Sequence, residues 1–502
     1  MTQVTRNHDS RSSFDRAQNE RDSHFQPSTL HSGRSTAQPK ASFSRISLIM
    51  SRIVDSVKKS LLGRESQSYQ SIPNGDRHSA GEADASRDPI SELEQPQKVD
   101  MFEYGVFVLL GVAMLWSWNM FMACATYFQG RFAENQFILT YFQSMILGVS
   151  TIVNLAVMIY LSYRQSSANY PYRICISLVL NCVTFTILAL STIMFRVSAV
   201  PYLVFTLFSV FVAAASTGFS QNGVFAFVNT FGGIYTQAIM TGQGVAGVLP
   251  AIAQIISVLL VPSGTGEAGE DGASASPKSA FLYFMTATFV SGLCLCLFLV
   301  LLSRHGITIK GQTQPLFTSE TDSEDIGAHK SVSLVLLSKK LSYPAFAIWL
   351  SFCLTMVFPV FTQAIVSTCP DGSGRAFQPD VFIPMAFLLW NLGDLSGRMA
   401  CGYDRIVLRN PKMLVAVAAL RALFIPLYMM CNVAGKGAAI NSDMFYWLVQ
   451  LGFGFTNGWL GTSAMVVAPD YVDDDEKEAC GGFMGLCLVM GLATGSVMSF
   501  FV

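Results

Sequence analysis

An aspartate and an arginine stand four residues apart in "WNLGDLSGR", Trp390 to Arg398, inside an otherwise apolar run. Residues at i and i+4 share one face of a helix, so Asp394 and Arg398 can form an ion pair. Charges buried in a membrane are costly even when paired, so we expect this pair to face the interior of a bundle or a wet cavity. A carboxylate that accepts and a guanidinium that donates suit a polar substrate. The alternative is a structural ion pair that orients helices.

Two further apolar runs hold polar or aromatic groups that could contact a ring-bearing ligand. Gln221, in "GFSQNGVF", has an amide that offers a donor and an acceptor, which suits a heterocyclic base. Its alternative role is a hydrogen bond between helices. Trp118 and Asn119 lie deep in "MLWSWNMF", where the indole could stack on a ring while the amide forms a hydrogen bond. Ordinary packing is the alternative for this pair.

The composition of the chain places these residues in a membrane. Of the 502 residues, 51% are hydrophobic and only 13% are charged, whereas soluble domains carry about 25% charged residues. The chain is therefore expected to be an all-α polytopic membrane protein with a polar tail at residues 1–100. The net charge of -1 gives no indication of nucleic-acid binding.

Apolar runs of ~20 residues, the length that crosses a bilayer as a helix, predict about eleven transmembrane helices. The runs are 104–127, 136–163, 172–195, 201–228, 232–261, 280–303, 344–366, 380–403, 411–433, 443–469 and 479–502. Six fall in an N-terminal bundle at 101–303 and five in a C-terminal bundle at 344–502, joined by a cytoplasmic linker at 304–343. Most loop Lys and Arg lie on the side of the tail, so the N-terminus is predicted to be cytoplasmic and the C-terminus extracellular or lumenal.

The tail has few apolar residues and is expected to be mostly disordered. One segment, residues 44–64, alternates basic and apolar residues at helical spacing, which is typical of a helix on an anionic bilayer surface. The sequence "YQSI", Tyr69 to Ile72, has the form of a sorting signal. Together they favour a vacuolar or lysosome-like membrane, with the plasma membrane as the alternative.

Several classes of protein are not supported by the sequence. All six histidines fall in the tail or close to the central linker, so no histidine is available for a metal site or acid–base catalysis within the membrane. The eleven cysteines show no metal-ligand spacing. Neither a phosphate-binding loop nor a nucleophile elbow is present. We therefore expect no enzyme activity, no cofactor and no metal.

In order along the chain, several motifs resemble those of the equilibrative nucleoside transporter family. The resemblance covers residues 104–502 and rests on "SWNMF", "SQNG", "IMTGQGVAG", "FIPMAFLLWNLGDLSGR", "RALFIPLYMMCN" and "FGFTNGWLGTSAMVVAP". It implies a major-facilitator-like bundle of six plus five helices that moves nucleosides by alternating access. One departure is Ser117, which stands where the family commonly has a proline.

The resemblance also implies a substrate site. By position, Asp394 and Arg398 would bind the ribose hydroxyls, Asn391 would lie one turn earlier on the same face, and Gln221 would bind the nucleobase. The remaining positions, on the first span, would line or flank the pocket: Leu115, Trp118, Asn119 and Met122.

The function expected from these observations is facilitated diffusion of nucleosides such as adenosine and uridine. The nearest alternatives are a proton-coupled nucleoside or nucleobase carrier and a major-facilitator-like carrier for another small polar solute. A membrane sensor or scaffold is a further alternative, because the tail and the acidic "SETDSEDIG" of the linker could bind partners. The oligomeric state is left open.

Overall fold

The computed structural model describes residues 99–165, 168–194, 197–260, 277–307, 332–356, 358–369 and 374–499. All of them lie in one compact unit, Ser66–Val502. The amphipathic segment predicted at 44–64 and the "YQSI" sequence lie outside the described residues, as do most of the tail and the middle of the linker.

Seven helices lie between the tail and the linker in the described parts of the chain. They are α2 (Met101–Ala123), α3 (Ala125–Phe132), α4 (Gln136–Tyr163), α5 (Tyr170–Met194), α6 (Ala199–Val228), α7 (Gly233–Leu260) and α8 (Pro277–Arg304). Asp100 caps α2, because its Oδ1 accepts a hydrogen bond from the backbone N–H of Phe102 at 2.8 Å. The first span was predicted to reach residue 127, but α2 ends at Ala123 and α3 continues beyond a break at Cys124.

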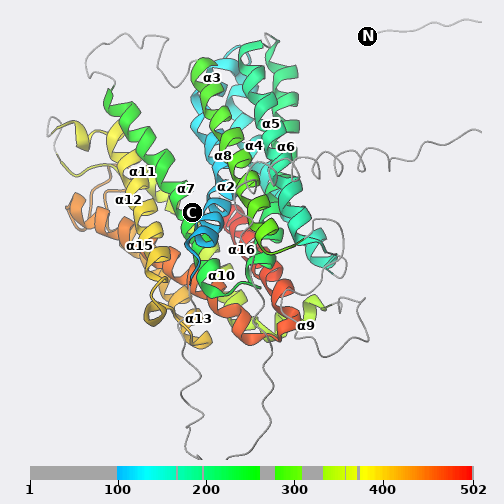
Figure 1. Cartoon of the computed structure of the whole chain (residues 1–502). Helices are drawn as coiled ribbons and strands as arrows, with labels where there is room; N and C mark the ends of the chain where they lie inside the picture. Colours follow the sequence, from blue (N-terminus) through cyan, green and yellow to red (C-terminus); the bar gives the residue numbers. More distant parts are fainter. Residues whose placement is uncertain are drawn as a thin grey trace, which may run out of the picture. The chain divides into compact units, whose positions relative to one another are not determined.

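The helices after the linker are shorter and more often interrupted. The short helix α9 (Leu334–Lys340) lies within the predicted linker. It is followed by α10 (Ser342–Thr355), α11 (Phe358–Ala364), α12 (Pro379–Ala400), α13 (Pro411–Leu420), α14 (Phe424–Met429), α15 (Asp443–Val467) and α16 (Lys477–Met498), as Figure 1 shows.

Proline accompanies both interruptions of the predicted spans that follow the linker. A proline lacks an N–H, and its ring clashes with the carbonyl four residues back. In the span predicted at 344–366, α10 ends at Thr355, four residues before Pro359. In the span predicted at 411–433, a 3₁₀ turn at Arg421–Leu423 separates α13 from α14, and Pro426 follows that turn. Both spans are therefore broken helices rather than continuous ones.

Nine helical segments of the described residues are long and apolar enough to cross a membrane. The chain is thus an all-helical polytopic membrane protein. The prediction of eleven spans also counts α12 and α15, which do not meet the same hydropathy requirement. These two helices carry Asp394, Arg398 and Asn457, so the residues that lower their hydropathy are those of the candidate site.

Helix α7 packs against both α2 and α12, and α12 packs against α15. The close contacts of α7 with α2 and of α12 with α15 depend on glycine. A Cβ atom on Gly242 of α7 would lie 2.0 Å from the carbonyl oxygen of Val108, and one on Gly458 of α15 would lie 1.9 Å from that of Asp394. No larger residue fits without moving backbone, so the glycines fix the spacing of the helices around the site. Gly242 forms a buried ridge of small residues with Ala238 and Ala246, which lets the neighbouring helices approach closely.

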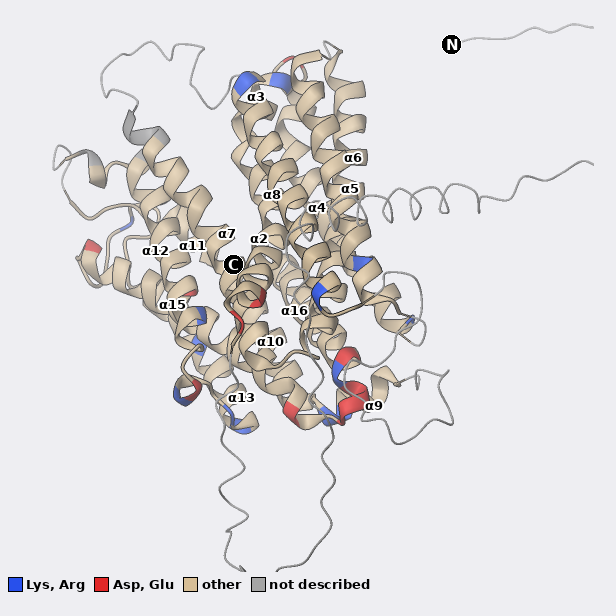
Figure 2. Ribbon diagram, viewed as in Figure 1, with Lys and Arg blue, Asp and Glu red and all other residues tan. Residues whose placement is uncertain are grey.

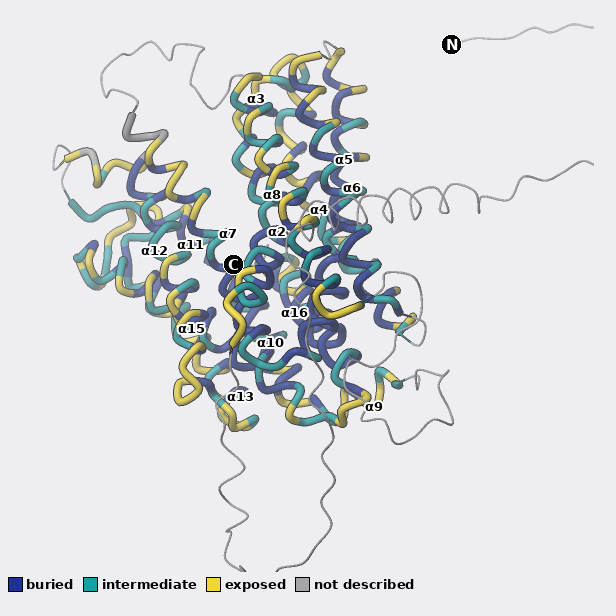
Figure 3. The backbone as a smooth tube through the Cα atoms, viewed as in Figure 1, coloured by how far each residue is buried: buried dark blue, intermediate teal, exposed yellow. Residues whose placement is uncertain are grey.

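The last helix, α16, joins the two halves of the chain. It is buried along most of its length and contacts α4 and α6 on one side and α10 on the other (Figure 3). In Figure 2 several charged residues gather near α9, α13 and the start of α16, and others lie near α3 at the opposite end of the molecule. At the end of α9, Lys340 forms ion pairs with Asp473 and Glu476 at 2.8 and 2.5 Å. Hydrogen bonds to Asp473 and Glu476 raise the pKa of Lys340 above its usual value.

Candidate functional site

The predicted ion pair is present on α12 and lies inside the bundle. Arg398 Nε donates to Asp394 Oδ2 at 2.7 Å. The two residues are 4% and 5% exposed, so neither charge faces lipid. This confirms the expectation, drawn from the i, i+4 spacing, that both side chains point into the protein.

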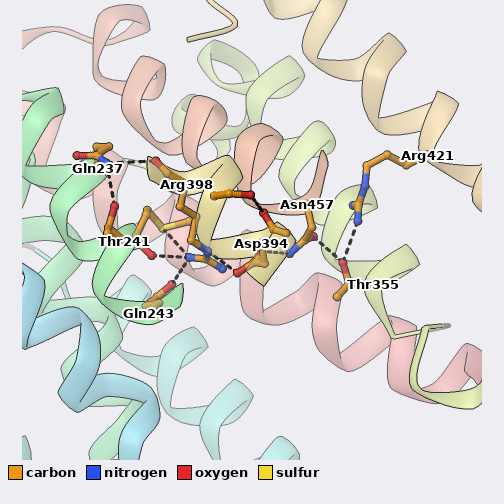
Figure 4. A network of polar contacts seen from close by, with 11 residues as sticks. Gln237, Thr241, Gln243, Thr355, Asp394, Arg398, Arg421 and Asn457 are labelled. Atoms are coloured by element: carbon orange, nitrogen blue, oxygen red, sulfur yellow. Dashed lines mark hydrogen bonds and ion pairs between the residues drawn. The ribbon is translucent and has the colours of Figure 1, made fainter. Parts of the chain in front are cut away.

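Each charge has further partners on neighbouring helices (Figure 4). Asn457 of α15 donates from Nδ2 to Asp394 Oδ1 at 2.7 Å. Arg398 Nη1 donates to the carbonyl oxygen of Met240 at 2.9 Å and to Gln243 Oε1 at 3.1 Å, both on α7. Both carboxylate oxygens are thus occupied, whereas Arg398 Nη2 makes no hydrogen bond with any of the described residues. The guanidinium keeps one donor group free for a ligand.

The polar contacts continue along α7 towards α2. Gln237 Nε2 donates to Thr241 Oγ1 at 2.8 Å and to the carbonyl oxygen of Arg398 at 3.1 Å. Tyr104 of α2 donates from its hydroxyl to Gln237 Oε1 at 3.0 Å. These contacts tie the two halves of the chain together beside the ion pair, because α2 and α7 precede the linker and α12 follows it.

Of the predicted residues of the first span, Asn119 contacts the same helix α7. Asn119 Nδ2 donates to the carbonyl oxygen of Ala246 at 2.6 Å. Trp118 is half-buried against an aromatic cluster that includes Phe121. Leu115 is half-buried, and Met122 is exposed.

Asn391 also reaches α7, from the opposite side. Its Nδ2 donates to the carbonyl oxygen of Phe387, and its Oδ1 would lie 2.4 Å from a Cβ placed on Gly247. Gly247 follows the Ala246 that Asn119 contacts, so the amides of α2 and α12 flank one short stretch of α7.

Gln221 stands apart from the ion pair. It is buried on α6, and its Oε1 accepts a hydrogen bond from Asn154 Nδ2 of α4 at 3.3 Å. Among the described residues, neither a hydrogen bond nor a ring contact links Gln221 to Asp394, Arg398 or Trp118. The structure therefore groups Asp394, Arg398, Asn391 and Asn119 around α7, whereas Trp118 packs in the aromatic cluster and Gln221 lies with α4.

Sequence reasoning missed several residues of the network. Gln237 and Gln243 lie on either side of Thr241, within or next to the quoted "IMTGQGVAG", where the amides could have been noticed as polar groups in an apolar run. Thr355 gives no such signal, because an isolated threonine is common in membrane helices. No group of three or more His, Cys, Asp or Glu residues in the described parts of the chain could hold a metal ion.

Comparison with known proteins agrees with this architecture. Two solved sugar symporters of the major facilitator superfamily share the fold. The proton:xylose symporter XylE has a TM-score of 0.54 and 11% identity, with 79% of this chain and 87% of that chain covered. The Escherichia coli fucose:proton symporter FucP has a TM-score of 0.52 and 14% identity, with 80% of this chain and 92% of that chain covered. These likenesses show that the chain is a multi-pass membrane protein with a major-facilitator-like fold, and its buried ion pair lies on α12 where that helix contacts α7 of the other half.

Sequence comparison gives the family. A family model described as "Nucleoside transporter" matches residues 207–502. The Saccharomyces cerevisiae "Nucleoside transporter FUN26" is 29% identical over 464 residues, covering 85% of this chain and 88% of its own. The human "Equilibrative nucleoside transporter 1" is 24% identical over 467 residues, covering 82% and 99%. The chain belongs to the equilibrative nucleoside transporter family, as its motifs predicted.

Proposed function

We propose that this chain carries nucleosides such as adenosine and uridine across a membrane by facilitated diffusion, with alternating access between its two halves. Family membership supports nucleosides as the substrate class. The observation that carries the mechanism is the buried Asp394–Arg398 pair at the contact between α7 and α12. A membrane protein that needed only packing there could use apolar side chains, which avoid the cost of burying charge.

The pair suits the vicinal hydroxyls of a ribose. Asp394 can accept from a hydroxyl in addition to its present donors, because a carboxylate has about four lone-pair sites. Arg398 Nη2 can donate to a hydroxyl oxygen without breaking a hydrogen bond to a described residue. A ligand without these hydroxyls would enclose the charged groups and leave them unpaired, which makes such a site selective.

The nucleobase would lie against the first span. Trp118 offers a ring face for stacking, Leu115 and Met122 offer apolar surface, and the amides of Asn119 and Asn391 lie on either side of α7. Gln221 would contact the base only if α6 and α4 moved with respect to α7, because its Oε1 now accepts from Asn154. Gln221 is thus proposed as a contact of another state of the transport cycle.

The contacts of Asp394 favour an uncoupled carrier. Arg398 Nε and Asn457 Nδ2 are donors, and a proton on the carboxyl group would face one of them. The ionised form therefore fits its surroundings, and a carrier of this kind needs no proton to complete its cycle. Coupling to protons is the alternative that the transport experiment distinguishes.

The proposed topology has eleven spans, six before the linker and five after it, with a cytoplasmic N-terminus and an extracellular or lumenal C-terminus. The tail at 1–100 and the linker at 304–343 would then be cytoplasmic. Two contacts between the halves lie at the end of the bundle that this topology places on the cytoplasmic side. Gln237 Nε2 donates to the backbone carbonyl oxygen of Arg398, and Asn229 Nδ2 donates to that of Lys477, each at 3.1 Å. Alternating access requires that these contacts break when the cytoplasmic side opens.

The proposed location is a vacuolar or lysosome-like membrane or the plasma membrane. Support comes from the sequence alone, through the "YQSI" signal and the basic tail segment. Imaging of the tagged full chain, with and without a Tyr69→Ala substitution, tests the sorting signal.

Uptake by proteoliposomes tests the transport function. Purified full-length protein is reconstituted, and labelled uridine uptake is measured at equal pH on both sides and with an imposed inward acid gradient. The proposal predicts saturable uptake that reaches the same final internal concentration in both conditions, and competition by adenosine but not by free ribose. Gradient-driven accumulation would instead indicate proton coupling. Competition by adenine as strong as that by adenosine would favour a nucleobase carrier.

A further inference from the structure

Arg421 is a buried arginine that the proposed transport mechanism does not use. It is 2% exposed and begins the 3₁₀ turn between α13 and α14. The ion pairs among the described residues do not include it. Its guanidinium donates instead to neutral groups: Nη1 to the carbonyl oxygen and the hydroxyl of Ser351, and Nη2 to Thr355 Oγ1 at 3.5 Å. Burial of a charge without a carboxylate partner is costly, which points to a role for the donors themselves.

The N–H donors of Arg421 determine which acceptor the Thr355 hydroxyl donates its hydrogen bond to. That hydroxyl has one proton and two acceptors in reach, the carbonyl oxygen of Ser351 at 2.8 Å and Asn457 Oδ1 at 2.7 Å. Arg421 Nη1 already donates to the same Ser351 carbonyl at 2.8 Å. Because Arg421 occupies that carbonyl and also donates to Thr355 Oγ1, the threonine proton is directed to Asn457.

The side chain of Asn457 connects the Thr355 hydroxyl to the ion pair through hydrogen bonds at both ends of its amide, as Figure 4 shows. With its Oδ1 accepting from Thr355, its Nδ2 faces Asp394 Oδ1 at 2.7 Å. The reversed amide would place a carbonyl oxygen against the carboxylate, which is repulsive. The Thr355 hydroxyl and the Asp394 carboxylate therefore hold the side-chain amide of Asn457 from its two ends, in the one orientation that donates to Asp394.

We propose that Arg421 and Thr355 are positioning residues for substrate selection: through Asn457 they hold the Asp394 carboxylate in the orientation that accepts the ribose hydroxyls. The inference rests on the proposed function. It extends the site across α10, the α13–α14 break and α15 to groups that do not touch Asp394 themselves. Substitution of these groups should therefore raise the KM for substrates that carry ribose hydroxyls and leave the KM for substrates without them unchanged.

Substitutions at Thr355 test the inference in proteoliposomes. Thr355→Val keeps the shape and removes the hydroxyl, Thr355→Ala removes the hydroxyl with less bulk, and Thr355→Ser keeps the hydroxyl. Uptake of uridine and of 2′,3′-dideoxyuridine is measured for each, with melting temperatures to show that the protein is folded. Loss of a well-oriented charged hydrogen bond corresponds to about a tenfold change in affinity, so both hydroxyl-free variants should raise the KM for uridine about tenfold. The KM for dideoxyuridine should stay unchanged, and Thr355→Ser should resemble the unsubstituted protein.

Each other outcome overturns a defined part of the reasoning. Equal changes for the two substrates, or no change for either, would show that Thr355 acts on packing alone and would overturn the inference while the transport function stands. Absence of saturable uridine uptake by the unsubstituted protein would overturn the proposed function and the inference with it. A Thr355→Ser variant as impaired as Thr355→Val would show that keeping the hydroxyl does not preserve substrate selection, and it would overturn the inference.

Discussion

Replacing the Asp394 side chain should lower both the free energy of unfolding and the uptake of uridine. Replacing Arg398 in addition should restore stability but not uptake. In an Asp394→Ala variant two donors lose their acceptor, Arg398 Nε and Asn457 Nδ2, each at 2.7 Å. Hydrogen bonds to a charged group contribute about 1.5–3 kcal/mol each, and a buried ion pair broken on one side typically costs about 3–5 kcal/mol. We therefore expect the free energy of unfolding to fall by about 3–5 kcal/mol.

The double variant Asp394→Ala/Arg398→Met separates the two roles of the pair. Replacing both charges removes the unpaired guanidinium, so at least half of the lost stability should return. Uridine uptake should stay lost in the single and the double variants, because neither offers charged partners for ribose. Thermal unfolding in detergent and uptake in proteoliposomes measure the two quantities, and Asp404→Asn, on an exposed carboxylate, is the matched control. Near-normal uptake by the double variant would refute the assignment of the pair to the substrate.

The remaining predictions concern the surroundings of the pair. Gly458→Ala should lower the melting temperature and impair uptake, because the added Cβ would lie 1.9 Å from the Asp394 carbonyl oxygen. Gly452→Ala, on the same helix but with no contact closer than 3.6 Å, is its control and should behave like the unsubstituted protein. Equal melting temperatures for the two variants would contradict the close-packing argument. Gln243→Leu should raise the KM for uridine several-fold, because Arg398 loses an acceptor at 3.1 Å and its guanidinium can rotate away; an unchanged KM would show that Gln243 does not orient the arginine.

The ion pair could be predicted from the sequence because its geometry is local. The i, i+4 spacing of Asp394 and Arg398 brings the side chains together on any regular helix, and the apolar run around them predicts that they face inwards. The relay from Arg421 through Thr355 could not be predicted in this way. It depends on three segments that meet only in the folded bundle, so no periodicity in the sequence reports it.

The approximate positions of the helices were predictable, but their interruptions were less so. Pro359 and Pro426 lie inside predicted spans at two of the breaks, but Pro250 and Pro384 lie inside the continuous helices α7 and α12, so a proline alone does not indicate a break. Hydropathy predicts spans least well at α12 and α15. These helices carry the polar residues of the candidate site, and those residues lower the mean hydropathy of the helices. The partners of Gln221 were missed because its spacing from Asn154 reflects the packing of α4 on α6.

The measurement that tests the central claim most directly is the preference for uridine over 2′,3′-dideoxyuridine, expressed as the ratio of Vmax/KM, in the unsubstituted protein and in Asp394→Asn. If the carboxylate binds the ribose hydroxyls, the unsubstituted protein should prefer uridine by about tenfold or more, and the variant should transport both poorly and nearly equally. A preference of the same size in both proteins would show that the hydroxyls are recognised elsewhere and that the buried pair is structural.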